Sequence, residues 1–156
     1  MALYGCIVFL VYFLDQSSKF CVRRFISQGT SIPVIKDVFH LTLIHNTGAA
    51  FGIFREHTYV FVIIAALAVV LITAFLIKKA RVLNAFERTA LCFVLGGTLG
   101  NLTDRVLYGY VTDFMDIRVW PVFNIADSFI TVGAFMLAVS VVMSLRKEKR
   151  SKEVRK

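Results

Sequence analysis

The stretch Tyr59–Ile77, with the sequence YVFVIIAALAVVLITAFLI, contains no charged side chain. A helix of nineteen residues is about 28 Å long at 1.5 Å per residue, which is enough to cross the hydrocarbon core of a bilayer. Ser128–Leu145 is a second uncharged run of similar length. The two runs therefore predict two membrane-spanning helices.

Two other apolar runs become long enough to span only when their polar ends are included. Met1–Leu14 is followed by Asp15 and Lys19, and Thr89–Thr103 is followed by an Asp-Arg pair. A cleaved signal peptide is the alternative for the first run, but it lacks a basic start and a small-residue cleavage site. We predict one membrane all-α domain over residues 1–156, with four transmembrane helices at residues 2–22, 58–77, 87–107 and 126–145.

Composition supports a membrane protein. The chain is 58% hydrophobic, against roughly 45–50% in soluble domains, and its mean hydropathy is +0.73. The net charge of +8 is concentrated in residues 78–88 and in the tail 146–156, which flank predicted spans. Such clusters mark the cytoplasmic side and contact anionic lipid. We therefore expect both termini in the cytoplasm, a basic cytoplasmic tail, and no nucleic-acid partner.

The segment between the first two spans is expected outside the cytoplasm. Ser31–Ile35 and Val38–Ile44 alternate weakly and contain many β-branched residues, which predicts short strands. Asn46 and Gly48 follow with turn chemistry. We expect a small extracytoplasmic β-sheet platform resting on the bilayer surface.

Ionisable residues near a span are costly and usually mark function. Asp15 and Lys19 are four residues apart, so they share a helix face and can pair. They either contact substrate or form a neutralised pair at the helix end, unless Lys19 extends to the interface. A Ser–Lys nucleophile with Ser17 or Ser18 is disfavoured, because such close neighbours do not face each other on a helix.

A glycine-rich stretch precedes a second polar group. Gly96 and Gly100 form a G-x-x-x-G pattern, which allows another helix to approach closely. Asn101, Asp104 and Arg105 share one helix face. Packing explains the glycines, but it does not explain three polar side chains.

Two aspartates near the same membrane face are the strongest candidates for chemistry. Asp113 lies in the second outer segment, and Asp127 begins the fourth span one turn after Asn124. Asp127 alone fits a charge at a helix N-terminus or an N-cap. Two carboxylates meeting at a partly dry surface instead hold a single proton, as in aspartic-protease hydrolysis.

Metal and cofactor chemistry find little support in the sequence. The three histidines show no metal-ligand spacing, and the three cysteines show no C-x-x-C. We expect no metal and no cofactor.

Five motifs cover nearly the whole chain: Asp15-Gln-Ser-Ser-Lys19, Asn46-Thr-Gly-Ala-Ala-Phe-Gly52, Gly96-Gly-Thr-Leu-Gly-Asn-Leu-Thr-Asp-Arg105, Val111-Thr-Asp-Phe114 and Phe123-Asn-Ile-Ala-Asp127. In this order they closely resemble the motifs of the lipoprotein signal peptidase (signal peptidase II) family.

The resemblance implies an aspartyl endopeptidase of the bacterial cytoplasmic (inner) membrane, with its active site near the outer face. Its substrate would be a diacylglyceryl-modified prolipoprotein cleaved before the lipidated cysteine, and its inhibitors would be globomycin-type compounds. Separately, we expect a monomer. The family's catalytic pair corresponds to Asp113 and Asp127. Its supporting residues correspond to Asp15, Lys19, Asn46, Gly48, Asn101, Asp104, Arg105 and Asn124.

The chain departs from the family pattern in two places. The stretch between the two aspartates is a few residues short, so Met115–Pro121 must close the gap. The N-terminus also lacks the basic residues that often precede the first span.

Two other functions compete with a peptidase. A small ion or proton translocator needs polar groups at several depths, whereas the acidic candidates lie near the outer face. A scaffold that packs through its glycines leaves the carboxylates unexplained.

Overall fold

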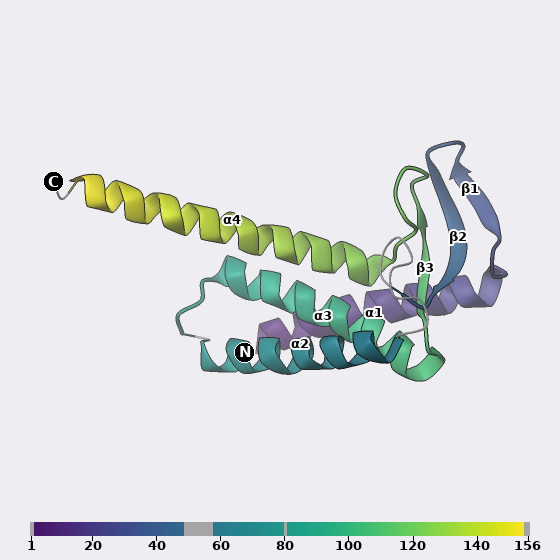
Figure 1. Cartoon of the computed structure of the whole chain (residues 1–156), viewed down its shortest axis with the longest axis horizontal. Coiled ribbons are helices and arrows are strands. Elements are labelled where there is room, and N and C mark those ends of the chain that lie inside the picture. Colours follow the sequence, from purple (N-terminus) through teal and green to yellow (C-terminus); the bar gives the residue numbers. More distant parts are fainter. Residues whose placement is uncertain (1, 49–57, 80, 155–156) are drawn as a thin grey trace.

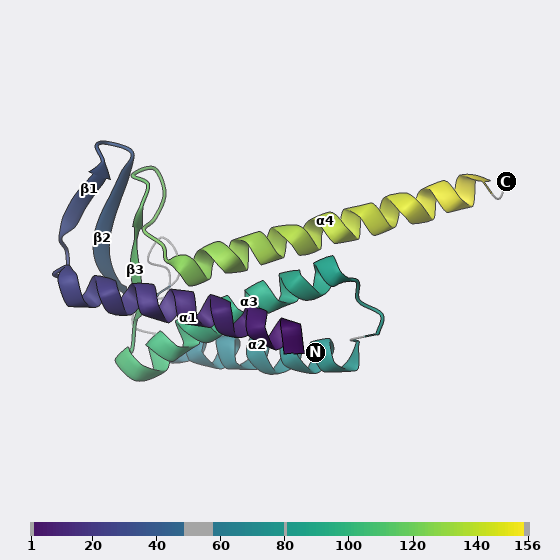
Figure 2. The same ribbon diagram turned by 180° about the vertical axis from the view of Figure 1, so that it is seen from behind.

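The computed structural model describes residues 2–48, 58–79 and 81–154. Four helices run lengthwise and a small sheet stands at one end of them; both ends of the chain point away from the sheet (Figures 1 and 2). The helices are α1 (Ala2–Phe25), α2 (Thr58–Lys78), α3 (Ala85–Tyr108) and α4 (Ile125–Val154); the strands are β1 (Ser31–Ile35), β2 (Phe39–Asn46) and β3 (Val111–Asp116). In the second motif, Ala49–Gly52 lies outside the described residues.

Helices α1 and α3 continue through their charged ends, as predicted. By length and composition, Ala2–Phe25, Thr58–Lys78 and Ile125–Glu153 can each cross a membrane. Helix α3 has the same length as α1. It carries the polar residues Asn101, Asp104 and Arg105 near its end. It packs against each of the other three helices, which is consistent with a fourth span. Helix α4 runs past the predicted end at residue 145 and includes most of the basic tail.

Helix α3 approaches its neighbours through glycines. A Cβ on Gly96 would lie 2.8 Å from Val11 Cβ of α1, and one on Gly97 would lie 2.5 Å from the Ala126 carbonyl oxygen of α4. A Cβ on Gly100 would collide with the Asp15 carboxylate. The packing interpretation of these glycines is confirmed.

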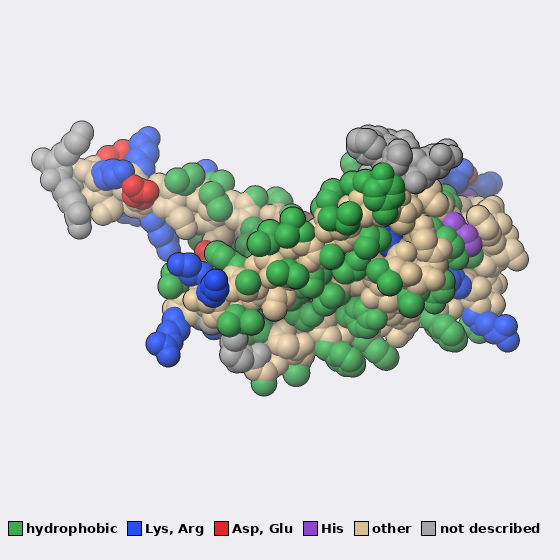
Figure 3. All heavy atoms as spheres, turned by 60° about the horizontal axis from the view of Figure 1, so that its bottom comes forward, with side chains coloured by type: hydrophobic (Ala, Val, Ile, Leu, Met, Phe, Trp, Pro, Cys, Tyr) green, Lys and Arg blue, Asp and Glu red, His purple; other side chains and the backbone are tan. Residues whose placement is uncertain are grey.

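Most large hydrophobic side chains face outward rather than into a core. Helix α2 has no buried residue. Figure 3 shows hydrophobic side chains spread over the helices, with Lys and Arg at both ends of the molecule. An outward apolar surface of this kind is stable in lipid.

The three strands form an antiparallel sheet in the order β1-β2-β3. The first two strands were predicted from their alternation, whereas β3 was not. It brings Asp113 opposite Ile44 of β2. Beneath the sheet, a small apolar cluster joins it to the end of α1; its buried members are Val22, Ile26, Leu43 and Phe114.

Substituting Gly97 by Ala should lower the thermal unfolding temperature in detergent. The new methyl group meets a backbone oxygen and Ile130 Cγ1 at 2.8 Å, and overpacking of this kind costs about 1–3 kcal/mol. Gly5→Ala is the matched control, because a Cβ there meets nothing within 4 Å. Equal unfolding temperatures for the two variants would contradict the close packing of α3 on α4.

Candidate active site

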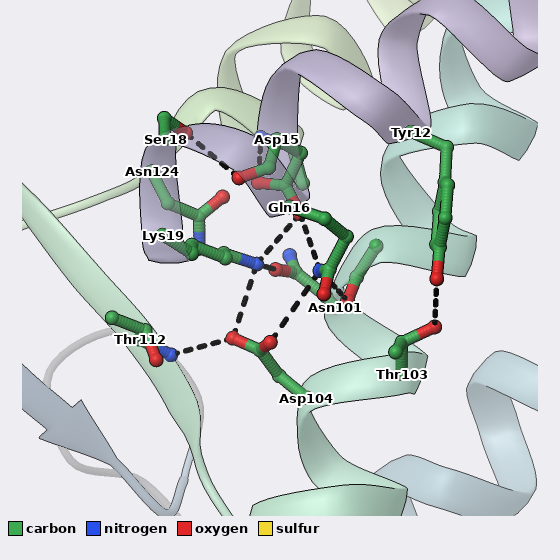
Figure 4. Close-up of polar contacts among 12 residues, drawn as sticks. Tyr12, Asp15, Gln16, Ser18, Lys19, Asn101, Thr103, Asp104, Thr112 and Asn124 are labelled. Carbon is green, nitrogen blue, oxygen red and sulfur yellow. Dashed lines mark hydrogen bonds and ion pairs between the residues drawn. The ribbon is translucent and has the colours of Figure 1, made fainter. Parts of the chain in front are cut away.

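A buried lysine lies at the centre of the polar cluster (Figure 4). Lys19 is fully buried, and its Nζ lies 2.9 Å from Asp15 Oδ2 and 3.2 Å from Asp104 Oδ2. It also donates to Asn101 Oδ1 at 2.8 Å. The predicted Asp15–Lys19 pair is confirmed, and Lys19 does not extend to the interface.

The carboxylates that neutralise Lys19 also hold other parts of the chain. Asp15 Oδ1 accepts from the Ala126 backbone N–H at 2.9 Å, at the start of α4. Asp104 Oδ2 accepts from the Thr112 N–H at 2.9 Å, within β3. One buried network therefore fixes α1, α3, α4 and β3 relative to one another.

Replacing Lys19 by Met should destabilise the protein strongly. Removal of one partner from a buried ion pair leaves uncompensated charge, at a cost of about 3–5 kcal/mol. Lys152→Met is the matched control, because Lys152 forms an exposed pair with Glu148 at the same four-residue spacing. Thermal unfolding in detergent should show a large loss for the first variant and little change for the second. Equal behaviour would mean that the buried network does not stabilise the fold.

The two candidate aspartates are held by amide side chains. Asp113 is 2% exposed, and it accepts from Asn46 Nδ2 at 2.9 Å and from Asn124 Nδ2 at 2.7 Å. Asp127 Oδ1 accepts from Asn101 Nδ2 at 2.7 Å. Both carboxylates are therefore fixed in position, by residues of β2, α3 and the start of α4.

Asn124 links the aspartates through the start of α4. Its Oδ1 accepts from the Asp127 N–H at 2.9 Å, and Asp127 Oδ2 accepts from the Asn124 N–H at 3.3 Å. This reciprocal pair is a capping box. The sequence prediction that Asp127 could be the N-cap was wrong: α4 begins at Ile125, so Asn124 occupies the cap and Asp127 the first turn.

Lys19 determines the orientation of the neighbouring Asn101 side-chain amide. Its ammonium group can only donate, so Asn101 must present Oδ1 to it, and Asn124 Nδ2 donates to that same oxygen at 3.1 Å. The Asn101 Nδ2 is then directed to Asp127. The buried charge thus orients the donor that holds the carboxylate.

The surroundings of Asp113 favour its protonated form. Burial, and after it the negative charge of Asp127, raise the pKa of Asp113 from 3.8 to about 7, although the hydrogen bonds from Asn46 and Asn124 oppose the shift. Near neutral pH the Asp113 carboxyl group therefore carries a proton for much of the time. This is the property that general acid catalysis needs.

Both aspartates line a cavity of about 270 Å³. Arg105 also lines it, with its guanidinium 5.2 Å from the centre of the Phe61 ring and Nη2 3.4 Å from the Gly48 carbonyl oxygen. The buried Arg105 Nε has no hydrogen-bond partner among the described residues. The cavity thus combines two carboxyl groups with one cation, and its remaining lining residues are Asn46, Gly48, Asn101, Val111, Trp120, Pro121, Val122, Phe123 and Thr131.

The family model described as Signal peptidase (SPase) II matches residues 7–143. The chain belongs to the signal peptidase II family. It is 41% identical over 152 residues to the lipoprotein signal peptidase of Pelotomaculum thermopropionicum, covering 96% of this chain and 97% of the relative. It is 43% identical over 131 residues to that of Halothermothrix orenii, covering 84% and 89%.

A solved structure shares the fold. A bacterial membrane enzyme determined by the in meso method at 2.3 Å resolution superposes with a TM-score of 0.87, at 32% identity, covering 93% of this chain and 90% of that one. The chain is therefore a bacterial membrane peptidase.

The segment between the two aspartates of this peptidase is a loop whose ends are joined by backbone hydrogen bonds between Met115 and Phe123, a pair that we call the neck. Met115 donates its N–H to the Phe123 carbonyl oxygen at 2.7 Å, and Phe123 donates back to Met115 at 3.0 Å. Within the loop, Arg118 has a φ of 67°, and its N–H donates to Asp116 Oδ1 at 2.8 Å. Residues 116–122 thus make the connection beyond this backbone pair. That the stretch is shorter than in other members of the family stays a prediction.

Sequence analysis did not single out Arg23, Gln16 or Thr112, which belong to the same network; Gln16 Nε2 donates to Asp15 Oδ2 at 3.1 Å and to Asp104 Oδ1 at 3.4 Å. Arg23 donates to Thr112 Oγ1 at 2.8 Å, lies 3.4 Å from Asp104 Oδ1, and covers the Tyr108 ring at 4.6 Å. It follows Lys19 by four residues, so the helical spacing that identified Lys19 extends to it.

Two further kinds of site considered from the sequence are a Ser–Lys nucleophile and a metal site. Ser18 Oγ donates to the Asp15 carbonyl oxygen at 2.7 Å, while Lys19 Nζ bonds the buried carboxylates, so no Ser–Lys pair forms. Among the described residues, no group of three or more His, Cys, Asp or Glu side chains is placed to hold a metal ion.

Proposed function

We propose that this chain is an aspartyl endopeptidase that removes the signal peptide from diacylglyceryl-modified bacterial prolipoproteins, cleaving before the lipidated cysteine. Family membership and relatives named lipoprotein signal peptidase support this function. The observation that carries the aspartyl mechanism is the shared cavity of Asp113 and Asp127, together with the raised pKa of Asp113. The whole of residues 1–156 acts as one membrane peptidase domain.

The two aspartates take opposite roles in the proposed reaction. The ionised Asp127 removes a proton from water, whose oxygen attacks the scissile carbonyl carbon, while the protonated Asp113 donates its proton to the carbonyl oxygen. When the tetrahedral intermediate collapses, the C–N bond breaks and a proton passes from Asp127 to the leaving amine of the cysteine. Asp113 recovers its proton from a hydroxyl group of the collapsing intermediate, so both carboxyl groups return to their starting protonation states.

The remaining polar residues support this pair. Asn101 and Asn124 hold Asp127 and Asp113, and Asn46 holds Asp113 from the sheet. Arg105, beside the Gly48 carbonyl oxygen, contributes positive charge where the substrate backbone enters. Asp15, Lys19 and Asp104 stabilise the scaffold.

The proposed orientation has the sheet outside the cytoplasmic membrane and both termini in the cytoplasm. The basic residues at the opposite end of the bundle support this orientation. A second cavity of about 490 Å³, lined largely by apolar side chains of the loop and α4, shares Trp120, Phe123, Asp127 and Thr131 with the first. It offers room for the apolar signal peptide or for a globomycin-type inhibitor. We propose that the peptidase acts as a monomer.

The described part of the chain does not favour ion translocation. The buried charged side chains, which are Asp15, Lys19, Asp104, Asp113 and Asp116, gather near the sheet. The rest of the bundle carries no comparable series of polar groups through the described residues, as a translocation path would require.

Asp113→Asn and Asp127→Asn should each lower the rate of cleavage of a lipidated prolipoprotein by at least about a hundredfold, because a general acid or base typically accelerates a reaction by this factor or more. Asp116→Asn is the control, because Asp116 lies on the same strand but bonds Thr42 and Arg118 instead. Gel-shift cleavage assays with folded variants measure the effect. Near wild-type cleavage by either aspartate variant would exclude the proposed pair.

The stability of the protein should also depend on Asp113 in a pH-dependent way. Its pKa is 3.8 in the unfolded chain and about 7 in the fold, so the folded state binds the proton more tightly between these values. The stabilising effect of that proton is lost as pH rises from about 4 to about 7, and amounts to a few kcal/mol at most.

Thermal unfolding between about pH 5 and about pH 8 tests this dependence. The unfolding temperature of the wild type should fall more steeply with rising pH than that of Asp113→Asn, which carries no titrating group there. Asp116→Asn should follow the wild type, since the Asp116 pKa is lowered rather than raised. Parallel curves for wild type and Asp113→Asn would show that Asp113 does not titrate in this range.

A further inference from the structure

A third cavity lies at the end of the bundle away from the sheet. It measures about 210 Å³ and is lined by the start of α1, the end of α2 and the start of α3. Its walls are mostly apolar, with Val8, Leu76 and Leu95 contributed by the three helices in turn. We call it the inner groove. It shares no lining residue with the cavity of the two aspartates.

One cation lines the inner groove without a counter-ion. Arg88 is half-buried, covers the Tyr4 ring at 5.4 Å, and donates from Nε and Nη2 to the Leu83 carbonyl oxygen at 2.9 and 2.7 Å. None of the described carboxylates forms an ion pair with it. The neighbouring Glu87 accepts instead from Ser140 at 2.6 Å and from the Asn84 N–H at 3.0 Å.

Further positive charge follows the part of α2 that lines the groove. Ile77 lines the groove, and Lys78 follows it as the last residue of α2. Lys79 and Arg81 lie in the connection to α3. An apolar groove with a cationic end matches a molecule that has an apolar chain and an anionic head.

The inner groove also lies where two helices are weakly joined. Helix α2 packs mainly against α3, and α1 packs against α3 and α4. The groove is the place where side chains of α1 and α2 face a common space. A molecule that filled it would connect α2 to α1.

We propose that the inner groove binds an anionic glycerophospholipid of the inner leaflet, with its phosphate at Arg88 and Lys78 and one acyl chain along Val8, Leu76 and Leu95. Anionic lipid headgroups are attracted to such basic clusters beside spans. The bound lipid stabilises the packing of α2 and is separate from the peptidase site.

The test compares thermal unfolding in nanodiscs of phosphatidylcholine alone and in nanodiscs that also contain phosphatidylglycerol. The wild type should gain several degrees from phosphatidylglycerol. Arg88→Gln should lose most of that gain, because glutamine can still donate to the Leu83 oxygen but carries no charge. Lys152→Gln removes the same charge from a side chain that is 72% exposed and pairs with Glu148, and it should keep the gain.

A second variant fills the groove without disturbing the fold. Gly5 lines the groove, and a Cβ there meets nothing within 4 Å. Gly5→Phe should therefore fold, lose the gain from phosphatidylglycerol, and lose the phosphatidylglycerol molecule seen by native mass spectrometry on the wild type. Gly5→Ala should keep both.

Two outcomes would overturn the proposal. If Arg88→Gln and Gly5→Phe each respond to phosphatidylglycerol as the wild type does, the lipid acts elsewhere on the surface. If inorganic phosphate added to phosphatidylcholine nanodiscs reproduces the gain, the groove is a free-anion site rather than a lipid site. Cleavage activity is not the readout, so failure here leaves the peptidase proposal unaffected.

Discussion

The structure depends on one buried positive charge. The ammonium group of Lys19 is fully buried between α1 and α3, where a charge is stable only if it is paired and fully hydrogen-bonded. Asp15, Asp104 and Asn101 satisfy it. Because the two carboxylates also accept from the backbone of α4 and β3, neutralising the lysine fixes the elements that carry the catalytic candidates.

This arrangement gives the protein a polar interior at one end in place of a large apolar core. Its apolar side chains face outward, and association of helices in lipid relies on close packing and hydrogen bonds rather than on expulsion of water. The glycines of α3 allow the close approach, and the buried network supplies the hydrogen bonds. Rigidity near Asp113 and Asp127 therefore comes from the same contacts that hold the helices together.

Much of the fold could be predicted because its determinants are local in the sequence. Uncharged runs predicted the spans, the four-residue spacing of Asp15 and Lys19 predicted their pair, and the glycine spacing predicted close helix packing. Strand β3 could not be found in this way, because five of its six residues are buried and no alternation appears. Its partner β2 is also distant in the chain, with Ile44 pairing Asp113.

In the candidate site, too, the sequence predicted some features and only the structure showed the others. The family motifs identified its residues, but not how they bond. That Asn101 is oriented by Lys19, and that Asn124 both caps α4 and holds Asp113, depends on side chains that meet only in the folded chain. The N-cap position itself had a signal in the sequence, since an Asn followed three residues later by an acid is typical of a capping box.

The backbone pair between Met115 and Phe123 has a consequence for how such peptidases diversify. Residues beyond this neck can be inserted, deleted or exchanged while the strand on one side and the helix cap on the other keep their places. Substitutions beyond the neck can therefore reshape the cavity wall that Trp120, Pro121 and Val122 form while Asp113 and Asp127 keep their positions.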